Sequence, residues 1–487
     1  MTDQFDLTGP LPTGVTVLEA SAGTGKTYTI AGLAARYVCE GIPLEQLLLV
    51  TFTRMATGEL RERVRERLVS AERFLEGTGR SDPVNELLAT GTPDEVAVRR
   101  DRLSRALADF DAATISTTHG FCQEVLGGLG IAGDLEPDTV FVEDLGDLVD
   151  EVVDDLYVRR FHGHDGRPPF ERWQAGQIAR AAIGNPDAPI APAVGEVPEM
   201  RRALAEAVRK ELELRKRRLA VMTFDDLLTR LDDALADDAV AARLRDRYRV
   251  VLVDEFQDTD PVQWNIVRRA FAVEGVTLVL IGDPKQAIYA FRGADVYAYL
   301  EAARSAAARP TLEVNRRSDQ PLIDAYDALF GGLKLGHPDI AYRHVRAAED
   351  HRVSRLTDAP QGAPLRIRVV HRDDVRLTQG GYATAPSARE HIAKDVAADL
   401  VALLSSGARV DGEPVEPRHV AVLVPTNRNA ALVRDALDQA RIPAVINGAG
   451  SVFATAPARD WLRLLEALER PASVSRARSA ALTSFVG

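Results

Sequence analysis

Three segments that lie far apart in the chain carry residues able to do phosphate chemistry. The first is a glycine-containing loop that ends in a lysine and a hydroxyl: Ala20, Ser21, Ala22, Gly23, Thr24, Gly25, Lys26 and Thr27. Gly23 and Gly25 let backbone N–H groups turn toward phosphate oxygens beside a helix N-terminus. Lys26 would then reach the β- and γ-phosphates, and the Thr27 hydroxyl would ligate Mg²⁺. Taken alone, an unrelated glycine-rich turn is the alternative.

The second segment places two carboxylates after an apolar strand. Residues 250–253 are all valine or leucine, and Asp254 and Glu255 follow them directly. An open parallel sheet binds its ligand at the carboxyl ends of the strands. An acidic residue there can hold Mg²⁺, and a following glutamate can polarise the attacking water. Alone, this pair of carboxylates is weak evidence for a nucleotide site. Together with the Lys26 loop it is strong evidence.

The third segment, residues 276–295, is another apolar strand that ends in Gly282-Asp283. Gln286 follows it and can sense a γ-phosphate from that position. Tyr289, Phe291 and Arg292 then place aromatic rings beside a guanidinium, which suits the faces of unstacked bases. Ordinary core packing is the alternative for the two aromatic residues.

Strands and helices must hold these segments in place, and their pattern predicts an α/β fold with a parallel sheet. Val15, Val17 and Leu18 predict a strand, and helical spacing follows directly after the glycine loop. Residues 47–50 predict a second strand, followed by a helix with Leu60, Val64 and Leu68 on one face. The opposite face carries arginines that we expect to be solvated: Arg61, Arg63, Arg65 and Arg67.

Two further positions follow strands in this pattern. Phe52 lies in a strand-to-helix turn between two threonines, and Thr118-His119 follows the strand-like residues 113–117. A lone histidine is more often structural than catalytic. Residues 136–222 interrupt the alternation of strand and helix, which predicts a mostly helical inserted domain.

Composition describes an ordinary globular protein of several domains, with 487 residues, 46% hydrophobic residues and a net charge of -12. The two cysteines, Cys39 and Cys122, exclude a disulfide framework and predict small buried side chains. No stretch reaches the length of a membrane span, and the first residues lack signal-peptide character, so we expect a cytoplasmic protein without a membrane partner. The negative charge disfavours nucleic acid, although a local basic groove is compatible with it.

Six motifs occur together in one order, and this set resembles the superfamily 1 DNA helicases. They are EASAGTGKT, VTFTRMAT, TTHGFC, FDDLL, VDEFQDTDP and GDPKQAIYAFRGAD. The last motif together with HGFC resembles RecB-type subunits of RecBCD nuclease-helicases more than UvrD or Rep. The resemblance implies a RecA-like motor domain over 1–135 and 223–312 and a helical insert over 136–222. It further implies a partial second RecA-like domain over 313–470 and the start of another helical insert over 471–487.

The resemblance also assigns roles to residues at the matching positions. Lys26 and Thr27 would bind ATP·Mg²⁺, with Asp254 on the metal and Glu255 activating water. Gln286 would couple the nucleotide state to DNA, and Arg317 would reach the γ-phosphate. The residues expected to touch single-stranded DNA are Phe52, Thr118, His119, Tyr289, Phe291 and Arg292. Implied partners are DNA ends and RecC-like and RecD-like subunits.

Three departures from the family pattern shape the functional hypotheses. The adenine-contacting glutamine that the family has before the phosphate loop has no counterpart in residues 11–20. Arg316 stands where an aromatic residue is usual, and the later helicase motifs and the nuclease domain have no counterpart after residue 318. The first hypothesis is an ATP-dependent DNA helicase of RecB type in double-strand-break repair and homologous recombination. The second is a truncated relative that binds ATP and DNA without productive unwinding. The third is a regulatory phosphate-loop NTPase that does not act on DNA.

Overall fold

The computed structural model describes residues 4–129, 139–142, 144–163, 166–184, 188–191, 194–290, 293–447 and 452–486. Phe291 and Arg292, two of the expected DNA contacts, lie outside these residues. The chain divides into two compact units. The first comprises Met1–Ser318 and Asp327–Ala348, and the second comprises Asp319–Tyr326 and Glu349–Gly487. The domain boundaries expected from the sequence remain predictions.

The first unit is built on a six-stranded sheet in which every described strand pair is parallel. The strands are β1 (Val15–Ala20), β2 (Leu47–Thr51), β3 (Thr114–Thr117), β6 (Val250–Val253), β7 (Thr277–Gly282) and β8 (Thr311–Leu312). Their order in space is β3-β2-β6-β7-β1-β8, so β1 lies between β7 and β8, the two strands of this sheet that come last in the sequence. The predicted parallel α/β fold is confirmed.

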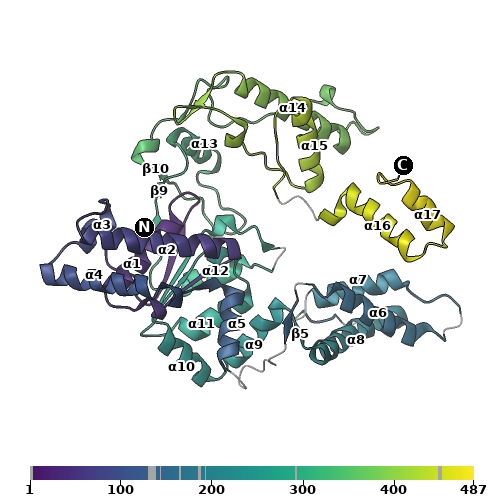
Figure 1. Ribbon diagram of the computed structural model, residues 1–487, viewed down its shortest axis with the longest axis horizontal. Coiled ribbons are helices and arrows are strands. Elements are labelled where there is room, and N and C mark those ends of the chain that lie inside the picture. The colour runs from purple at the N-terminus through teal and green to yellow at the C-terminus, as the bar shows by residue number, and fades with distance from the viewer. Residues whose placement is uncertain are drawn as a thin grey trace. The chain divides into compact units, whose positions relative to one another are not determined.

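Helices cover both faces of this sheet because its strands are apolar at consecutive positions. Along β7, Leu278 and Leu280 pack on one face, while Val279 and Ile281 pack on the other. One face is covered by α1 (Lys26–Cys39), α2 (Arg54–Leu75), α3 (Pro83–Leu88) and α4 (Pro93–Ala108). The other face is covered by α5 (Thr118–Leu129), α9 (Phe224–Ala234), α10 (Asp238–Arg247), α11 (Pro261–Phe271) and α12 (Val296–Ser305) (Figure 1).

Helix α2 buries the predicted apolar face, but one of its arginines differs from the prediction. Leu60, Val64 and Leu68 are buried as expected. Arg67 is buried too, so its assignment to a solvated face was wrong. Its guanidinium donates to both carboxylate oxygens of Asp82, at 2.7 and 3.0 Å, and the loop before α3 thereby closes over it.

The segment between α5 and α9 is mostly helical where it is described. Helices α6 (Gly146–Phe161), α7 (Arg172–Ile183) and α8 (Glu196–Leu219) enclose a small core with Val152, Val153 and Val208 at its centre. The chain enters and leaves these helices through a parallel pair of short strands, β4 (Val140–Phe141) and β5 (Val221–Met222). This core shares no residue with the two cores that flank the large sheet.

The last part of the chain passes between the units three times. Strand β9 (Val314–Asn315) pairs in parallel with β10 (Arg346–Ala347) inside the first unit, and α13 (Gln320–Phe330) contributes to both units. The second unit contains α14 (Ala385–Leu404), α15 (Asn427–Gln439), α16 (Ala456–Glu469), α17 (Val474–Ala481) and an antiparallel sheet of β11 (Leu356–Thr357), β12 (Arg409–Val410) and β13 (Glu413–Pro414). Its core is small and centres on Ala397, Val433 and Leu437.

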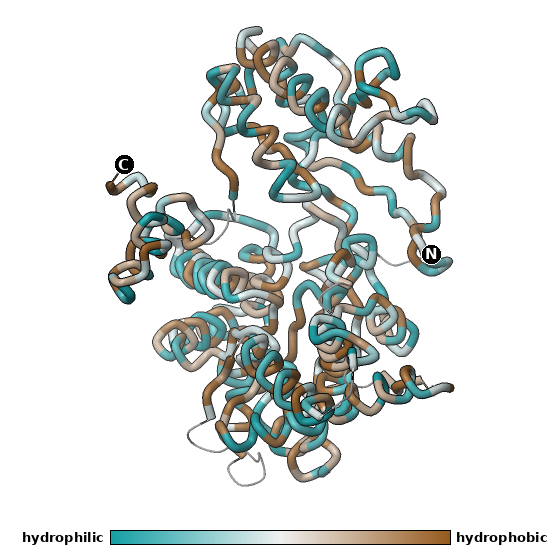
Figure 2. Tube along the Cα trace, turned by 90° about the vertical axis from the view of Figure 1, so that its right-hand side faces the viewer, coloured by the Kyte–Doolittle hydropathy of each residue, from teal (hydrophilic) through white to brown (hydrophobic). Residues whose placement is uncertain are grey.

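Along the helices in Figure 2, hydrophilic and hydrophobic positions alternate, as expected for elements with one buried face. In the described part of the chain no helix combines the length and the apolar character needed to cross a membrane. Cys39 and Cys122 are free and buried, as predicted, and burial raises the pKa of each thiol to about 12.

Candidate nucleotide site

The glycine loop connects strand β1 to helix α1 and leaves the helix N-terminus open. Gly23 and Gly25 have positive φ angles of 80° and 90°. Residues with a Cβ atom rarely adopt this left-handed conformation. The Thr24 hydroxyl donates to the Ser21 carbonyl oxygen at 2.7 Å and closes the loop. No side chain caps α1 at Gly25, so its first N–H groups remain available to an anion.

Two carboxylates follow β6 and face the end of the glycine loop. The Lys26 ammonium forms an ion pair with the Glu255 carboxylate, which brings together residues 229 positions apart. Glu255 has a left-handed backbone with φ of 51°, rare for a residue with a side chain. Burial, assisted by the Glu255 charge, raises the pKa of Asp254 to about 6. The pKa of Asp258 rises to about 6 for the same two reasons.

A buried amide links this carboxylate pair to the end of β7. Gln257 Nε2 donates to Glu255 Oε2 at 2.8 Å, and Gln257 Oε1 accepts the Asp283 N–H at 2.9 Å. Asp283 Oδ2 in turn accepts from Gln286 Nε2 at 2.8 Å. The structure therefore connects Glu255 to Gln286 through the Gln257 side chain and through the backbone N–H and the carboxylate of Asp283. Sequence reasoning missed Gln257, although its place two residues after Glu255 was a usable signal.

A charged cluster also lies where the glycine loop begins. Glu19, the residue before the loop, accepts from Lys285 Nζ at 3.1 Å and from Arg343 Nε at 2.8 Å. Lys285 also pairs with Asp283 at 2.7 Å. The Lys285, Glu19 and Asp283 side chains are 11%, 15% and 3% exposed, so the cluster is largely desolvated. It joins the ends of β1 and β7.

The turn after β9 lies directly against the glycine loop. The Arg316 N–H donates to the Gly23 carbonyl oxygen at 2.7 Å, which places Arg316 and Arg317 beside the loop. Tyr28, on the first turn of α1, is 44% exposed, and its ring lies 6.0 Å from the Arg67 guanidinium. Burial raises the pKa of the Tyr28 hydroxyl, and the charges of Arg67 and Arg316 act against this shift.

The expected DNA-contacting residues that the structure describes form two pairs of rings. Phe52 and Tyr289, which follow β2 and β7, have ring centroids 5.5 Å apart. His119, in the first turn of α5, meets Phe224 edge to face at 5.5 Å, and Thr118 begins the same helix. Burial lowers the pKa of His119. Sequence reasoning did not single out Phe224, because its contact with His119 joins residues far apart in the chain.

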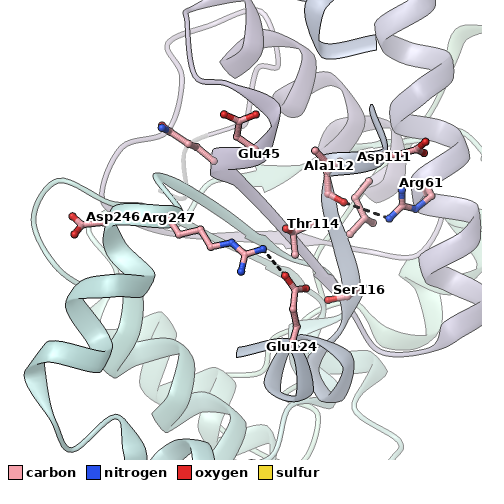
Figure 3. A pocket seen from close by; sticks show the side chains of 12 residues that line it. Glu45, Arg61, Asp111, Ala112, Thr114, Ser116, Glu124, Asp246 and Arg247 are labelled. Atoms are coloured by element: carbon pink, nitrogen blue, oxygen red, sulfur yellow. Dashed lines mark hydrogen bonds and ion pairs between the residues drawn. The ribbon is translucent and has the colours of Figure 1, made fainter. Parts of the chain in front are cut away.

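A separate cavity of about 740 Å³ lies beside the edge strand β3 (Figure 3). Its lining includes residues that precede β2, β3 and β6, among them Gln46, Ala113 and Arg247. Because the strands are parallel, this cavity lies toward their amino ends and shares no residue with the glycine loop. Arg247 is paired with Glu124 across it, and Arg61 donates to the Ala113 carbonyl oxygen.

The candidate site residues gather at one edge of the sheet. The glycine loop follows β1, Phe52 follows β2, Thr118 follows β3, Asp254 follows β6 and Asp283 follows β7. Parallel strands present their carboxyl ends at the same edge, where open α/β sheets bind ligands. The loop, the lysine and the carboxylate pair at this edge define a domain of the phosphate-loop nucleotide-binding class.

Comparison with known proteins identifies the family. Residues 2–307 match the UvrD/REP helicase N-terminal domain, and the chain belongs to this family. It is 47% identical to the RecBCD enzyme subunit RecB of Mycolicibacterium smegmatis over 99% of this chain and 45% of that protein. It is 28% identical to RecB of Escherichia coli over 97% of this chain and 51% of that protein.

The chain also matches a UvrD-type relative. The ATP-dependent DNA helicase UvrD2 of Mycobacterium bovis is 28% identical over 91% of this chain and 54% of its own length. The chain therefore spans about half the length of the curated relatives that it matches. The similarity to RecB agrees with the resemblance expected from the motifs.

Proposed function

We propose that this chain forms the ATP-hydrolysing motor part of an ATP-dependent DNA helicase of RecB type, which acts in double-strand-break repair and homologous recombination. The observation that carries this proposal is the Lys26–Glu255 pair between the glycine loop and the end of β6. A lysine that neutralises phosphate oxygens and a glutamate that polarises water are the parts that phosphoryl transfer to water requires. The similarity to proteins named as RecB subunits of RecBCD enzymes supports the proposed role in repair and recombination.

In this proposal the loop from Ala20 to Thr27 holds the ATP phosphates with its backbone N–H groups and Lys26. Arg317 reaches the γ-phosphate from the turn beside the loop, where a transition-state arginine is worth about 10³–10⁵ in rate. Gln286 senses the γ-phosphate, and its hydrogen bond to Asp283 leads through Gln257 to Glu255. The state of the nucleotide thereby reaches the residues that follow Gln286.

The residues present fit Mg²⁺. Asp254, Glu255 and Asp258 gather around a single paired lysine, and Asp258 Oδ1 is buried with no hydrogen-bond partner in the described structure, so a further cation would be stabilised there. Mg²⁺ is held by one or two carboxylates together with substrate phosphates, and these residues supply that number of carboxylates. We assign Thr27 and Asp254 to it, and the bound ion would neutralise charge on the β- and γ-oxygens.

The adenine base is assigned to the space between Tyr28 and Arg316. Both side chains are exposed, both flank the glycine loop, and each presents a flat surface to a base. Stacking recognises any base, whereas hydrogen bonds to the base edge select one. With stacking as the main contact, we expect weak preference for adenine over guanine.

Single-stranded DNA is assigned to the ring pairs at the same edge of the sheet. Phe52 and Tyr289 form one stacking platform, and Thr118, His119 and Phe224 form the other. Phe291 and Arg292 stay in the proposal on sequence grounds. The binding partners proposed beyond DNA are RecC-like and RecD-like subunits. The alternative functions remain binding of ATP and DNA without unwinding, and NTPase activity independent of DNA.

The test measures ATP turnover by the purified chain with and without single-stranded DNA, and strand separation on a duplex with a single-stranded tail. We expect DNA to stimulate turnover and Lys26→Ala to remove it. Lys210→Ala, which changes an exposed lysine on α8, serves as the matched control. ATP turnover indifferent to DNA would favour the regulatory NTPase, and stimulated turnover without strand separation would favour binding of ATP and DNA without unwinding.

A further inference from the structure

The side chain of Asn315 joins the glycine loop to the turn that carries Arg317. Its Nδ2 donates to the Ala22 carbonyl oxygen at 3.0 Å. Its Oδ1 accepts the N–H groups of Arg317 at 2.8 Å and of Ser318 at 2.9 Å. The amide orientation is fixed by these partners, because two backbone donors face Oδ1 and a carbonyl faces Nδ2. Asn315 is 7% exposed, so few water molecules compete for these bonds.

The contact is tight enough to constrain the glycine loop itself. A Cβ on Gly23 would lie 2.6 Å from Asn315 Oδ1 and 2.8 Å from Arg317 Cβ. Glycine is therefore required at position 23 for close approach of this turn as well as for its positive φ. The backbone of Asn315 is also held from its other side, because its carbonyl oxygen accepts the Ala348 N–H at 2.8 Å.

We infer that Asn315 is a positioning residue that sets Arg317 on the γ-phosphate by clamping the Arg317 turn onto Ala22 of the phosphate loop. The inference rests on the proposed function, since it assumes that Arg317 touches the γ-phosphate. The clamp fixes the Arg317 backbone relative to the loop that binds the same triphosphate. A long arginine side chain pays less conformational entropy to reach the phosphate when its backbone is already placed.

The consequence is selective for the triphosphate. ADP lacks the group that Arg317 reaches, so the loss of Asn315 weakens binding of a triphosphate and leaves ADP binding nearly unchanged. The quantity to measure is the ratio of the ADP dissociation constant to that of a slowly hydrolysed ATP analogue, ATPγS, by calorimetry on the full chain. Binding at equilibrium needs no turnover, so the test holds whatever the rate of hydrolysis.

We expect Asn315→Ala to lower this ratio about 10- to 100-fold, the size of a lost hydrogen bond to a charged group. Arg317→Ala should lower it equally, and the double variant should fall no further. An additive double variant would show that Asn315 does not act through Arg317. Equal weakening of ADP and ATPγS would show a merely structural role. Both results overturn the inference.

Two variants sharpen the result. Asn315→Asp keeps the oxygen that accepts from Arg317 and Ser318 but loses the donor to Ala22, so we expect it to resemble Asn315→Ala. A wild-type ratio in Asn315→Asp would contradict the clamp. Asn85→Ala removes another fully buried, hydrogen-bonded asparagine, and it should lose stability without changing the ratio. If Lys26→Ala bound ATPγS as tightly as the wild type, the proposed function itself would fail, which is a distinct outcome.

Discussion

The Lys26 ammonium and the Glu255 carboxylate form an ion pair across the site, one at the start of α1 and the other at the end of β6. Their side chains are 12% and 34% exposed, so water screens the pair only in part. A triphosphate that engages Lys26 competes with Glu255 for the same ammonium. Gln257 Nε2, which also donates to Glu255 Oε2, then becomes the group that holds the glutamate in place.

The first prediction follows from this competition. Glu255→Gln removes the negative charge that opposes phosphate binding, so ATP should bind at least as tightly as in the wild type. Turnover should fall about 10²–10⁴-fold because the group that accepts a proton from water is lost. Calorimetry gives the binding constant, and phosphate release gives the rate. Glu274→Gln, an exposed glutamate, is the matched control. Weaker ATP binding in Glu255→Gln would contradict the proposed competition.

The sequence predicted those parts of the site whose residues all lie within one short segment. The glycine loop and the strand with its two carboxylates are of this kind, and the parallel sheet follows from their apolar strands. Gln257, Glu19 and Asn315 act through partners that are distant in the chain, such as Asp283, Arg343 and Ala22. The prediction of a solvated Arg67 was wrong for the same reason. Its position on a helix face does not reveal that Asp82, from the loop before α3, pairs with it.

The second prediction concerns the base. Tyr28→Ala should weaken ATP binding about 5- to 150-fold, the equivalent of about 1–3 kcal/mol for stacking on one base. Tyr28→Phe keeps the ring and should bind ATP as the wild type does. Because stacking does not read the base edge, GTP should compete with ATP at similar concentrations in the wild type. Strong rejection of GTP would show that hydrogen bonds to the base, rather than stacking, set the selectivity.

The third prediction concerns DNA. Phe52→Ala removes one ring of the Phe52–Tyr289 pair, and single-strand affinity should fall by about 1–3 kcal/mol. Fluorescence anisotropy with a labelled oligonucleotide measures this change, and ATP binding should stay constant. Tyr297→Ala is the control because it removes an exposed ring on α12 outside the pair. If Phe52→Ala and Tyr297→Ala lost the same single-strand affinity, the Phe52–Tyr289 pair would have no specific role in DNA binding.

The fourth prediction concerns stability. Lys285 lies between Glu19 and Asp283, and its removal leaves two desolvated carboxylates with Arg343. Lys285→Ala should therefore lower the free energy of unfolding by about 3–5 kcal/mol. Lys394→Ala, an exposed lysine, should change it by less than about 0.5 kcal/mol. Glu19→Ala in the Lys285→Ala background should recover part of the loss, because it leaves one desolvated carboxylate in this cluster instead of two. A double variant less stable than Lys285→Ala would contradict this account.

The last prediction is a pH dependence. Burial is the main cause of the lowered pKa of His119, although the charges of Asp225 and Asp260 act in the opposite direction. As pH falls below about 6.5, the unfolded chain binds this proton before the folded protein does. The free energy of unfolding therefore decreases on acidification, and part of that decrease belongs to His119. His119→Gln cannot bind the proton, and every other titratable group is the same in the two proteins. Urea unfolding at about pH 7.5 and about pH 5.5 should show a smaller decrease in His119→Gln than in the wild type. An equal decrease would mean that His119 takes up its proton in the folded state as readily as in the unfolded chain, against the burial seen beside Phe224.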